Sequence, residues 1–291
     1  SEMSKSPTIT GYSTALFSTW LFLEEFGVLF DAGDGASAGL TQKSRKANFV
    51  FISHADRDHL GGLLQLHQLN AREGQPLICY PRDCGSFPAL QRFVEKFDPD
   101  VGPATWQAIG DGDEISISNS HIVQARRNEH VKKQNLDKSL DFLLIEQRRK
   151  LKEEFEGQSG EELAALRVEH GEDHITTPQR QRLIGYSGDT PRCEAERWRG
   201  VRWLLHEATF LHEKDCRGAH CNLPQVIAEA SQLDLQALVL THFSSRYSHA
   251  QIRSAITSEA KQHRPAFPIF AILPGNSVRN LLGGEPIWSP E

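Results

Sequence analysis

Residues 53–62, SHADRDHLGG, place two histidines and two aspartates within six positions, directly after the apolar run NFVFI. The apolar run is rich in aromatic and β-branched residues, which is typical of a buried strand. Such a strand holds its last residues at the rim of a sheet, where the following loop can direct polar side chains into a cleft. A single aspartate here would usually form a turn or cap a helix, and Asp58 before HLGGLLQLHQL could do so. The four side chains together, His54, Asp56, Asp58 and His59, instead predict a metal site that suits two ions better than one.

Further polar residues follow other predicted strands. These strands lead to Asp31 (GVLFDAG), His130 (HIVQARRNE), Asp189 (RLIGYS), His206 and Glu207 (VRWLL) and His242 (ALVL). We predict that TALFSTWLFLEE is a strand that pairs with GVLFDAG in a hairpin. Amphipathic helices, such as SFPALQRFVEKF, separate the strands. The chain is therefore expected to build a site along one edge of its sheets.

Composition limits the setting. With 291 residues, 38% of them hydrophobic, the chain can bury a sizeable core, and no repeat or linker divides it, so one domain over residues 1–291 is expected. No apolar run approaches the roughly 20 residues of a membrane helix, which predicts a soluble, cytoplasmic protein without a membrane partner. The five cysteines include no CxxC pair, so reduced thiols are expected. The net charge of −6 does not indicate a polyanion partner.

These motifs resemble those of a known family. SHADRDHLGG resembles the His-x-His-x-Asp-His signature of the metallo-β-lactamase superfamily, and the chain from about residue 10 to 250 resembles its ribonuclease Z branch. The further matches are Asp31 in FDAGDG, His130 in NEHV, Asp189 in YSGDT, His242 in LTHFSSRY, and HEATF followed by His220. The resemblance implies an α/β fold, a four-layer αββα sandwich of two mixed sheets with helices on the outer faces.

The same resemblance implies a site for two divalent metal ions, with zinc as the usual metal. By the family pattern one ion would be held by His54, Asp56 and His130. The second would be held by Asp58, His59 and His242, with Asp189 bridging the two. Asp31 would lie behind the ligands and fix one imidazole through its other ring nitrogen.

The implied chemistry is hydrolysis of an ester bond. Two cations lower the pKa of a water between them, so that a bridging hydroxide can attack in line, and Asp58 counts among the catalytic residues. His220 with Glu207 resembles the family's arrangement for giving the leaving oxygen a proton. His220 in CRGAHCN could also be an ordinary loop histidine.

The sequence departs from the family at two positions of the site. Asp56 stands where the signature has histidine, and a hard oxygen ligand lowers the preference for zinc relative to manganese or iron. Cys221 and Asn222 stand where the family has serine and threonine after the histidine.

The largest departure is a charged insertion at residues 148–182, where ribonuclease Z has a basic arm that grips tRNA. Between residues 153 and 173 this chain has eight acidic residues and one basic residue, Arg167. An acidic segment repels phosphates, so we expect a solvated helix between strands. Residues 126–152 carry nine Lys or Arg against four Asp or Glu and predict a basic track beside His130.

The favoured function is a dinuclear phosphodiesterase or endoribonuclease, with RNA or a nucleotide as substrate and tRNA processing as one form of it. One alternative is a metallo-β-lactamase-fold hydrolase of carboxylic esters, lactones or thioesters. The other is a non-catalytic relative that binds metal. The sequence identifies no protein partner, and the resemblance allows a homodimer.

Overall fold

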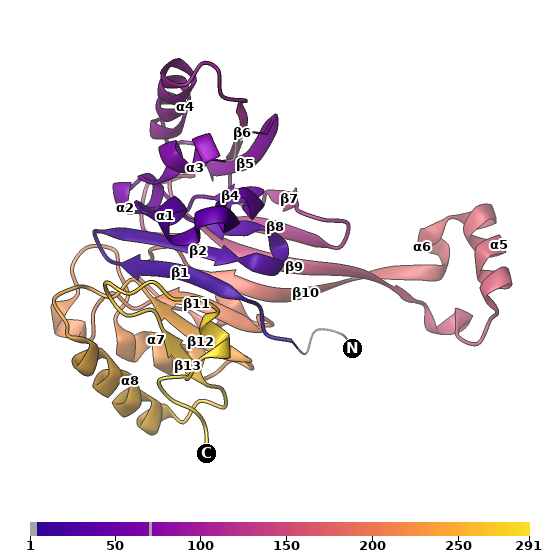
Figure 1. Cartoon of the computed structure of the whole chain (residues 1–291). Coiled ribbons are helices and arrows are strands. Elements are labelled where there is room, and N and C mark those ends of the chain that lie inside the picture. The colour runs from indigo at the N-terminus through magenta and orange to yellow at the C-terminus, as the bar shows by residue number, and fades with distance from the viewer. Residues whose placement is uncertain (1–4, 70–71) are drawn as a thin grey trace.

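The computed structural model describes residues 5–69 and 72–291, and these residues form two β-sheets that pack face to face (Figure 1). The first sheet contains, in spatial order, β1 (Ile9–Thr14), β2 (Ser18–Leu23), β3 (Val28–Phe30), β4 (Phe49–Phe51), β5 (Gly74–Pro81) and β6 (Ala104–Ile109). The second contains β13 (Ile269–Ala271), β12 (Ala237–Thr241), β11 (Trp203–Glu207), β10 (Thr176–Tyr186), β9 (Leu140–Leu151), β8 (His121–Arg127) and β7 (Glu114–Ser116). Strands β3 to β6 are parallel, as are β10 to β13, and the other neighbours are antiparallel. Both sheets are therefore mixed.

Helices cover the outer faces of the two sheets. The first sheet is covered by α1 (Ala36–Leu40), α2 (Arg57–Leu60), α3 (Leu63–Leu69) and α4 (Ser86–Phe97), and the second by α7 (Leu223–Ala230) and α8 (His249–His263). Short 3₁₀ helices are η1 (Glu24–Phe26), η2 (Thr41–Lys46), η3 (Glu153–Phe155), η4 (Ala195–Trp198), η5 (Glu213–Asp215) and η6 (Leu281–Gly283). The predicted four-layer αββα sandwich is confirmed. Within the described residues, no helix is long and apolar enough to cross a membrane.

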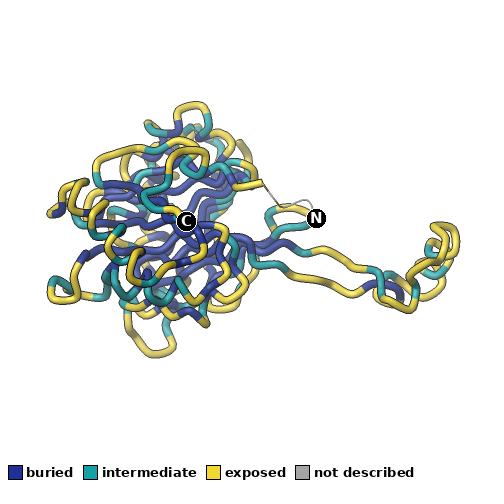
Figure 2. The backbone as a smooth tube through the Cα atoms, turned by 90° about the horizontal axis from the view of Figure 1, so that it is seen from below, coloured by how far each residue is buried: buried dark blue, intermediate teal, exposed yellow. Residues whose placement is uncertain are grey.

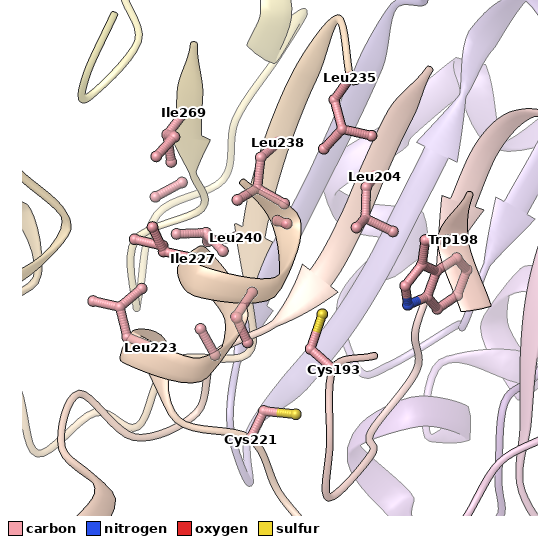
Figure 3. Packing of buried hydrophobic residues seen from close by; sticks show 14 of the residues in the cluster. Cys193, Trp198, Leu204, Cys221, Leu223, Ile227, Leu235, Leu238, Leu240 and Ile269 are labelled. Carbon is pink, nitrogen blue, oxygen red and sulfur yellow. The ribbon is translucent and has the colours of Figure 1, made fainter. Parts of the chain in front are cut away.

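Successive apolar side chains of a strand point to opposite faces of the sheet, so both faces are buried. In β2, Trp20 and Phe22 pack under the helices of the first sheet, whereas Leu21 and Leu23 point into the core between the sheets. The second sheet follows the same rule, because Val239 faces the inter-sheet core and its neighbours in β12 face α7. Figure 3 shows this outer layer, where side chains of α7 lie over Leu238, Leu240 and Leu204. Residues buried on both faces hold the strand ends rigidly, which positions the loops that follow.

The prediction of one strand over TALFSTWLFLEE is wrong at its start, whereas its pairing with GVLFDAG in a hairpin is confirmed, because β2 pairs antiparallel with β3. The chain reverses between Thr14 and Ser18, where the backbone N–H of Phe17 donates to the carbonyl of Thr14 at 3.1 Å. Leu16 occupies the turn with a φ of 73°, a conformation that glycine or asparagine usually supplies. The segment carries neither residue at this point, so no local residue type marks the turn.

The insertion forms a long arm. Strands β9 and β10 continue beyond the sandwich as a two-stranded ribbon, paired as far as Leu151 and Thr176, and α5 (Gly160–His170) and α6 (Glu172–Ile175) cap its far end (Figures 1 and 2). Helix α5 buries none of its residues, as predicted for a solvated helix. Strand β10 as a whole, from Thr176 in the arm to Tyr186 in the sheet, covers ten residue steps, roughly 33 Å at about 3.3 Å per residue. The tip of the arm therefore lies far from the sheet edge at which β10 ends.

Candidate metal centre

The predicted ligands come from one edge of the sandwich. Asp31 and His54 follow the parallel strands β3 and β4 of the first sheet, and Asp189 and His242 follow β10 and β12 of the second. His130 follows β8, which runs in the same direction as β10 because each is antiparallel to β9. Carboxyl ends of strands that run the same way meet at one edge, so residues more than 200 positions apart in the chain converge there.

Four side chains form the first cluster: His54, Asp56, His130 and Asp189 each offer one ligand atom, all within 4.8 Å of one another. Nε2 of His54 lies 3.2 Å from Oδ2 of Asp56 and 3.4 Å from Oδ2 of Asp189. Nε2 of His130 lies 3.7 and 3.9 Å from the same two oxygens. Asp56 differs from the other three because its side chain is 62% exposed, so its carboxylate reaches the cluster from the solvent side.

The second cluster contains Asp58, His59 and His242. Oδ2 of Asp58 lies 3.3 Å from Nε2 of His59 and 3.4 Å from Nε2 of His242. Asp189 connects the two clusters, because its Oδ2 lies 3.2 Å from Nε2 of His59 while its Oδ1 lies 3.4 Å from Nε2 of His242. This position between the clusters is what a bridging carboxylate requires.

Each of the four histidines in the two clusters has a hydrogen-bond partner at Nδ1, on the side of the ring away from the carboxylates. The Nδ1 atoms of His54 and His130 contact Ser53 Oγ and the Ala219 carbonyl, each at 2.9 Å. The Nδ1 atoms of His59 and His242 contact Asp31 Oδ2 and Thr209 Oγ1, each at 2.8 Å. Each ring therefore has its Nδ1 occupied and turns its Nε2 towards the carboxylates. Partners of this kind fix the tautomer and the direction of a metal-binding imidazole.

Asp31 is the most connected of these partners. Besides His59, its carboxylate accepts hydrogen bonds from the backbone N–H and the hydroxyl of Ser53 and from the hydroxyl of Tyr186. Ser53 in turn contacts His54, so one buried carboxylate orients an imidazole of each cluster. Asp31 was the predicted supporting residue, whereas Ser53, Thr209 and the Ala219 carbonyl were missed. Only the position of Ser53 beside His54 could have drawn attention to it in the sequence.

The donor set fits divalent metal ions. Nε2 of His59 is buried and has no hydrogen-bond partner, although two carboxylates lie close to it. Burial lowers the pKa of His59, but the charges of Asp189 and Asp31 outweigh it and raise that pKa well above its usual value. Burial raises the pKa of Asp189, yet His242, His59 and His54 hold it well below its usual range. Imidazole nitrogens and carboxylate oxygens that converge in this way are a set for zinc, manganese or iron.

His220 and Glu207 lie together beside the clusters. Nδ1 of His220 is 3.0 Å from Oε1 of Glu207, and Glu207 is fully buried at the end of β11. Burial lowers the pKa of His220, but the hydrogen bond and charge of Glu207 outweigh it and raise that pKa to about 9. The His220 ring stacks on His242 with centroids 5.3 Å apart and lies 5.0 Å from that of His130. Its side chain is 20% exposed, so it borders the site, unlike the fully buried His206.

The predicted basic track divides into two separate groups. Arg148 and Arg149 belong to the arm, where they pair with Glu146 and Asp173. Near the centre, Arg126 and Arg127 are paired with Asp141 and Asp137. Four exposed cations close to the ligands in the chain have no ion-pair partner among the residues the structure describes: Arg57, Lys132, Lys133 and Arg246. The positive charge without an ion-pair partner near the ligands therefore comes from the start of α2 and from loops, and the basic ribbon of the arm does not contribute to it.

The fold and the clusters of possible metal ligands are typical of a metal-dependent hydrolase. Comparison with known proteins identifies the family. The family model described as "Beta-lactamase superfamily domain" matches residues 27–243. The chain belongs to the metallo-β-lactamase superfamily, as a ribonuclease Z-like member.

Two relatives illustrate the similarity in sequence. The chain is 26% identical over 268 residues to tRNase Z TRZ1 of Arabidopsis thaliana, covering 86% of this chain and 90% of that protein. It is 27% identical over 263 residues to Ribonuclease Z of Bacillus licheniformis, covering 80% and 82%.

Solved structures agree on the fold. Human tRNase Z, short form, superposes with a TM-score of 0.59 at 18% identity, covering 82% of this chain and 93% of that one. The metallo-β-lactamase fold protein YhfI from Bacillus subtilis gives 0.64 at 13% identity, covering 94% and 100%.

Proposed function

We propose that the chain is a dinuclear, metal-dependent phosphodiesterase that cleaves RNA or nucleotide esters. His54, Asp56 and His130 would hold one ion, Asp58, His59 and His242 would hold the other, and Asp189 would be shared between them. One observation carries the proposal: four imidazoles have Nδ1 occupied by partners behind them and direct Nε2 towards a shared set of carboxylates. When bound, two divalent ions polarise a phosphoryl oxygen and lower the pKa of a water molecule.

The chain's own residues supply proton transfer to the leaving oxygen. Glu207 accepts from Nδ1 of His220, so Nε2 of that ring is the atom that can give a proton to substrate. Thr190 and Thr209 donate to the Glu207 carboxylate, which fixes it behind His220. Glu207 raises the pKa of His220, which favours the protonated imidazole that a general acid requires.

Phosphodiesters are favoured over carboxylic esters by the charge at the rim. Arg57 is exposed at the start of α2, next to Asp58, and Arg246 is exposed in the loop after His242, four residues beyond that ligand. Unpaired cations at such a site attract phosphates, whereas lactones and thioesters offer them no charge. The names of the relatives, tRNase Z and Ribonuclease Z, support the same bond type.

The test is hydrolysis by protein reconstituted with zinc or with manganese, its metal content verified by mass spectrometry. We expect turnover of bis(p-nitrophenyl) phosphate and of a short oligoribonucleotide, and little turnover of a lactone or a thioester. His220→Ala should lose most oligoribonucleotide cleavage, while His212→Ala, on the same loop but exposed, should lose none. Turnover of the lactone alone would reject phosphodiester cleavage, and metal binding without any turnover would identify a non-catalytic relative.

A further inference from the structure

The turn between β1 and β2 exposes two large apolar side chains. Leu16 is 88% and Phe17 is 62% exposed, although Ala15 and Ser18 on either side are buried. Scattered apolar residues are common on surfaces, but an adjacent pair at the tip of a turn forms a continuous apolar ledge. We call Leu16 and Phe17 the ledge.

One side of the ledge is attached to the loop that carries His242. The backbone N–H of His242 donates to Ser13 Oγ at 2.8 Å, and the N–H of Ala15 donates to the carbonyl of Phe243 at 3.2 Å. Leu16, the first residue of the ledge, therefore directly follows Ala15, whose hydrogen-bond partner Phe243 is next to the predicted ligand His242.

The other side is attached to the segment that packs on Asp58. Ser18 Oγ donates to the carbonyl of Asp34 at 2.7 Å, and the N–H of Gly33 donates to the carbonyl of Thr19 at 2.9 Å. Gly33 itself fits closely between these groups, because a Cβ there would lie 2.3 Å from both Asp58 O and Ser18 Oγ. The ledge thus lies between residues 33–34, which pack on Asp58 at the second cluster, and the loop of His242, and Figure 1 places this turn at the end of the sandwich away from the arm.

The ledge has two features that are unfavourable for folding. Leu16 adopts a φ of 73°, which strains any residue with a side chain, and its side chain is left in water. Backbone strain combined with exposed apolar surface is typical of sites that contact a ligand.

We infer that the ledge is a stacking surface for a nucleobase of the substrate, with Phe17 as the ring on which the base lies. The inference rests on the proposed phosphodiesterase function and specifies its substrate as a nucleoside ester. An open aromatic surface suits a flat base, because every base has a face that can stack. Arg57, at the start of α2 beside Asp58, and Arg246, in the loop after His242, suit the phosphates on either side of that base.

The experiment compares three esters with the same leaving group: methyl p-nitrophenyl phosphate and the 3′ and 5′ p-nitrophenyl phosphates of thymidine. Phe17→Ala should lower kcat/KM about tenfold for at least one thymidine ester and leave the methyl ester unchanged. Phe17→Trp should retain the preference. Phe97→Ala, which removes an aromatic ring that is 60% exposed on α4, is the matched control and should change nothing.

A binding measurement separates this inference from the proposed function. In protein freed of metal by a chelator, fluorescence anisotropy measures the binding of labelled hexauridylate. Phe17→Ala should bind it about tenfold more weakly, and Phe97→Ala should bind it as tightly as the unmodified protein. If no phosphodiester is cleaved but this difference is found, the phosphodiesterase proposal fails and the ledge stands. Cleavage of thymidine esters that Phe17→Ala leaves unchanged would overturn the ledge and keep the phosphodiesterase. Loss of long-chain thioester hydrolysis in Phe17→Ala would overturn it in favour of an acyl chain.

Discussion

The imidazole of His59 and the carboxylate of Asp31 meet in a fully buried hydrogen bond, with Nδ1 and Oδ2 2.8 Å apart. The contact joins two segments that are 28 residues apart and leaves Nε2 of His59 directed at Asp58 and Asp189. It shows how the centre is built: polar groups behind the predicted ligands hold each imidazole so that its Nε2 is directed at the carboxylates.

The first prediction concerns this supporting contact. Asp31→Asn should weaken metal binding by about 10- to 100-fold, because an amide cannot accept from His59, Ser53 and Tyr186 as the carboxylate does. Competition with a chromophoric chelator measures the affinity for zinc or manganese. Tyr186→Phe removes one donor and keeps the carboxylate, so its effect should be smaller. Unchanged affinity in Asp31→Asn would show that the contact is only structural.

Metal preference should depend on Asp56. Because its carboxylate supplies a hard oxygen where the family signature has a nitrogen, activity with manganese or iron should equal or exceed activity with zinc. Asp56→His should shift the preference towards zinc, and the folding risk is low because the side chain is mostly exposed. Parallel reconstitutions with each metal, assayed on one diester, measure this. Activity with zinc alone in the unmodified protein would count against the argument.

The role of His220 can be tested through the leaving group. His220→Ala should slow a substrate with a poor alkoxide leaving group at least tenfold more than one with nitrophenolate, which hardly needs a proton. Metal content should stay unchanged, since the ring's Nδ1 is bonded to Glu207 and the two main clusters are complete without it. An equal loss on both substrates, or a loss of metal, would make His220 a ligand or a structural residue.

The arm should not affect a small substrate. Its tip lies roughly 30 Å from the edge where β10 ends, several times the Debye length of about 8 Å, so its acidic residues are screened from the centre. Replacing residues 152–175 with an Asn-Gly turn between Leu151 and Thr176 should keep kcat/KM for a small diester and the melting temperature, because α5 buries nothing. Precursor tRNA should bind weakly before and after the replacement. Tight, salt-sensitive tRNA binding that disappears with the arm would show that the arm grips tRNA.

Apolar runs that alternate with amphipathic helices and end repeatedly in His, Asp or Glu predicted strands that share one polar edge, and the resemblance to the metallo-β-lactamase superfamily predicted the αββα layers. The same resemblance predicted which residues meet, and the structure brings them together because the ends of strands that run the same way converge. The sequence could not reveal Thr209 or the Ala219 carbonyl, because a hydroxyl or a backbone oxygen behind a histidine leaves no pattern in the chain. The turn at Leu16 was missed for a related reason: a residue held at positive φ by its surroundings lacks the glycine that marks such a turn.

The central claim is that two ions held by the seven ligands support phosphodiester hydrolysis. Titrating metal-free protein with manganese, while measuring bis(p-nitrophenyl) phosphate turnover and bound metal by mass spectrometry, tests it most directly. The account predicts that turnover rises until about two equivalents are bound, and that Asp189→Ala, which removes the bridging carboxylate, lowers both the bound metal and the turnover at least tenfold. Protein that binds no manganese and no zinc, or that binds two equivalents and turns over no phosphodiester, would contradict it.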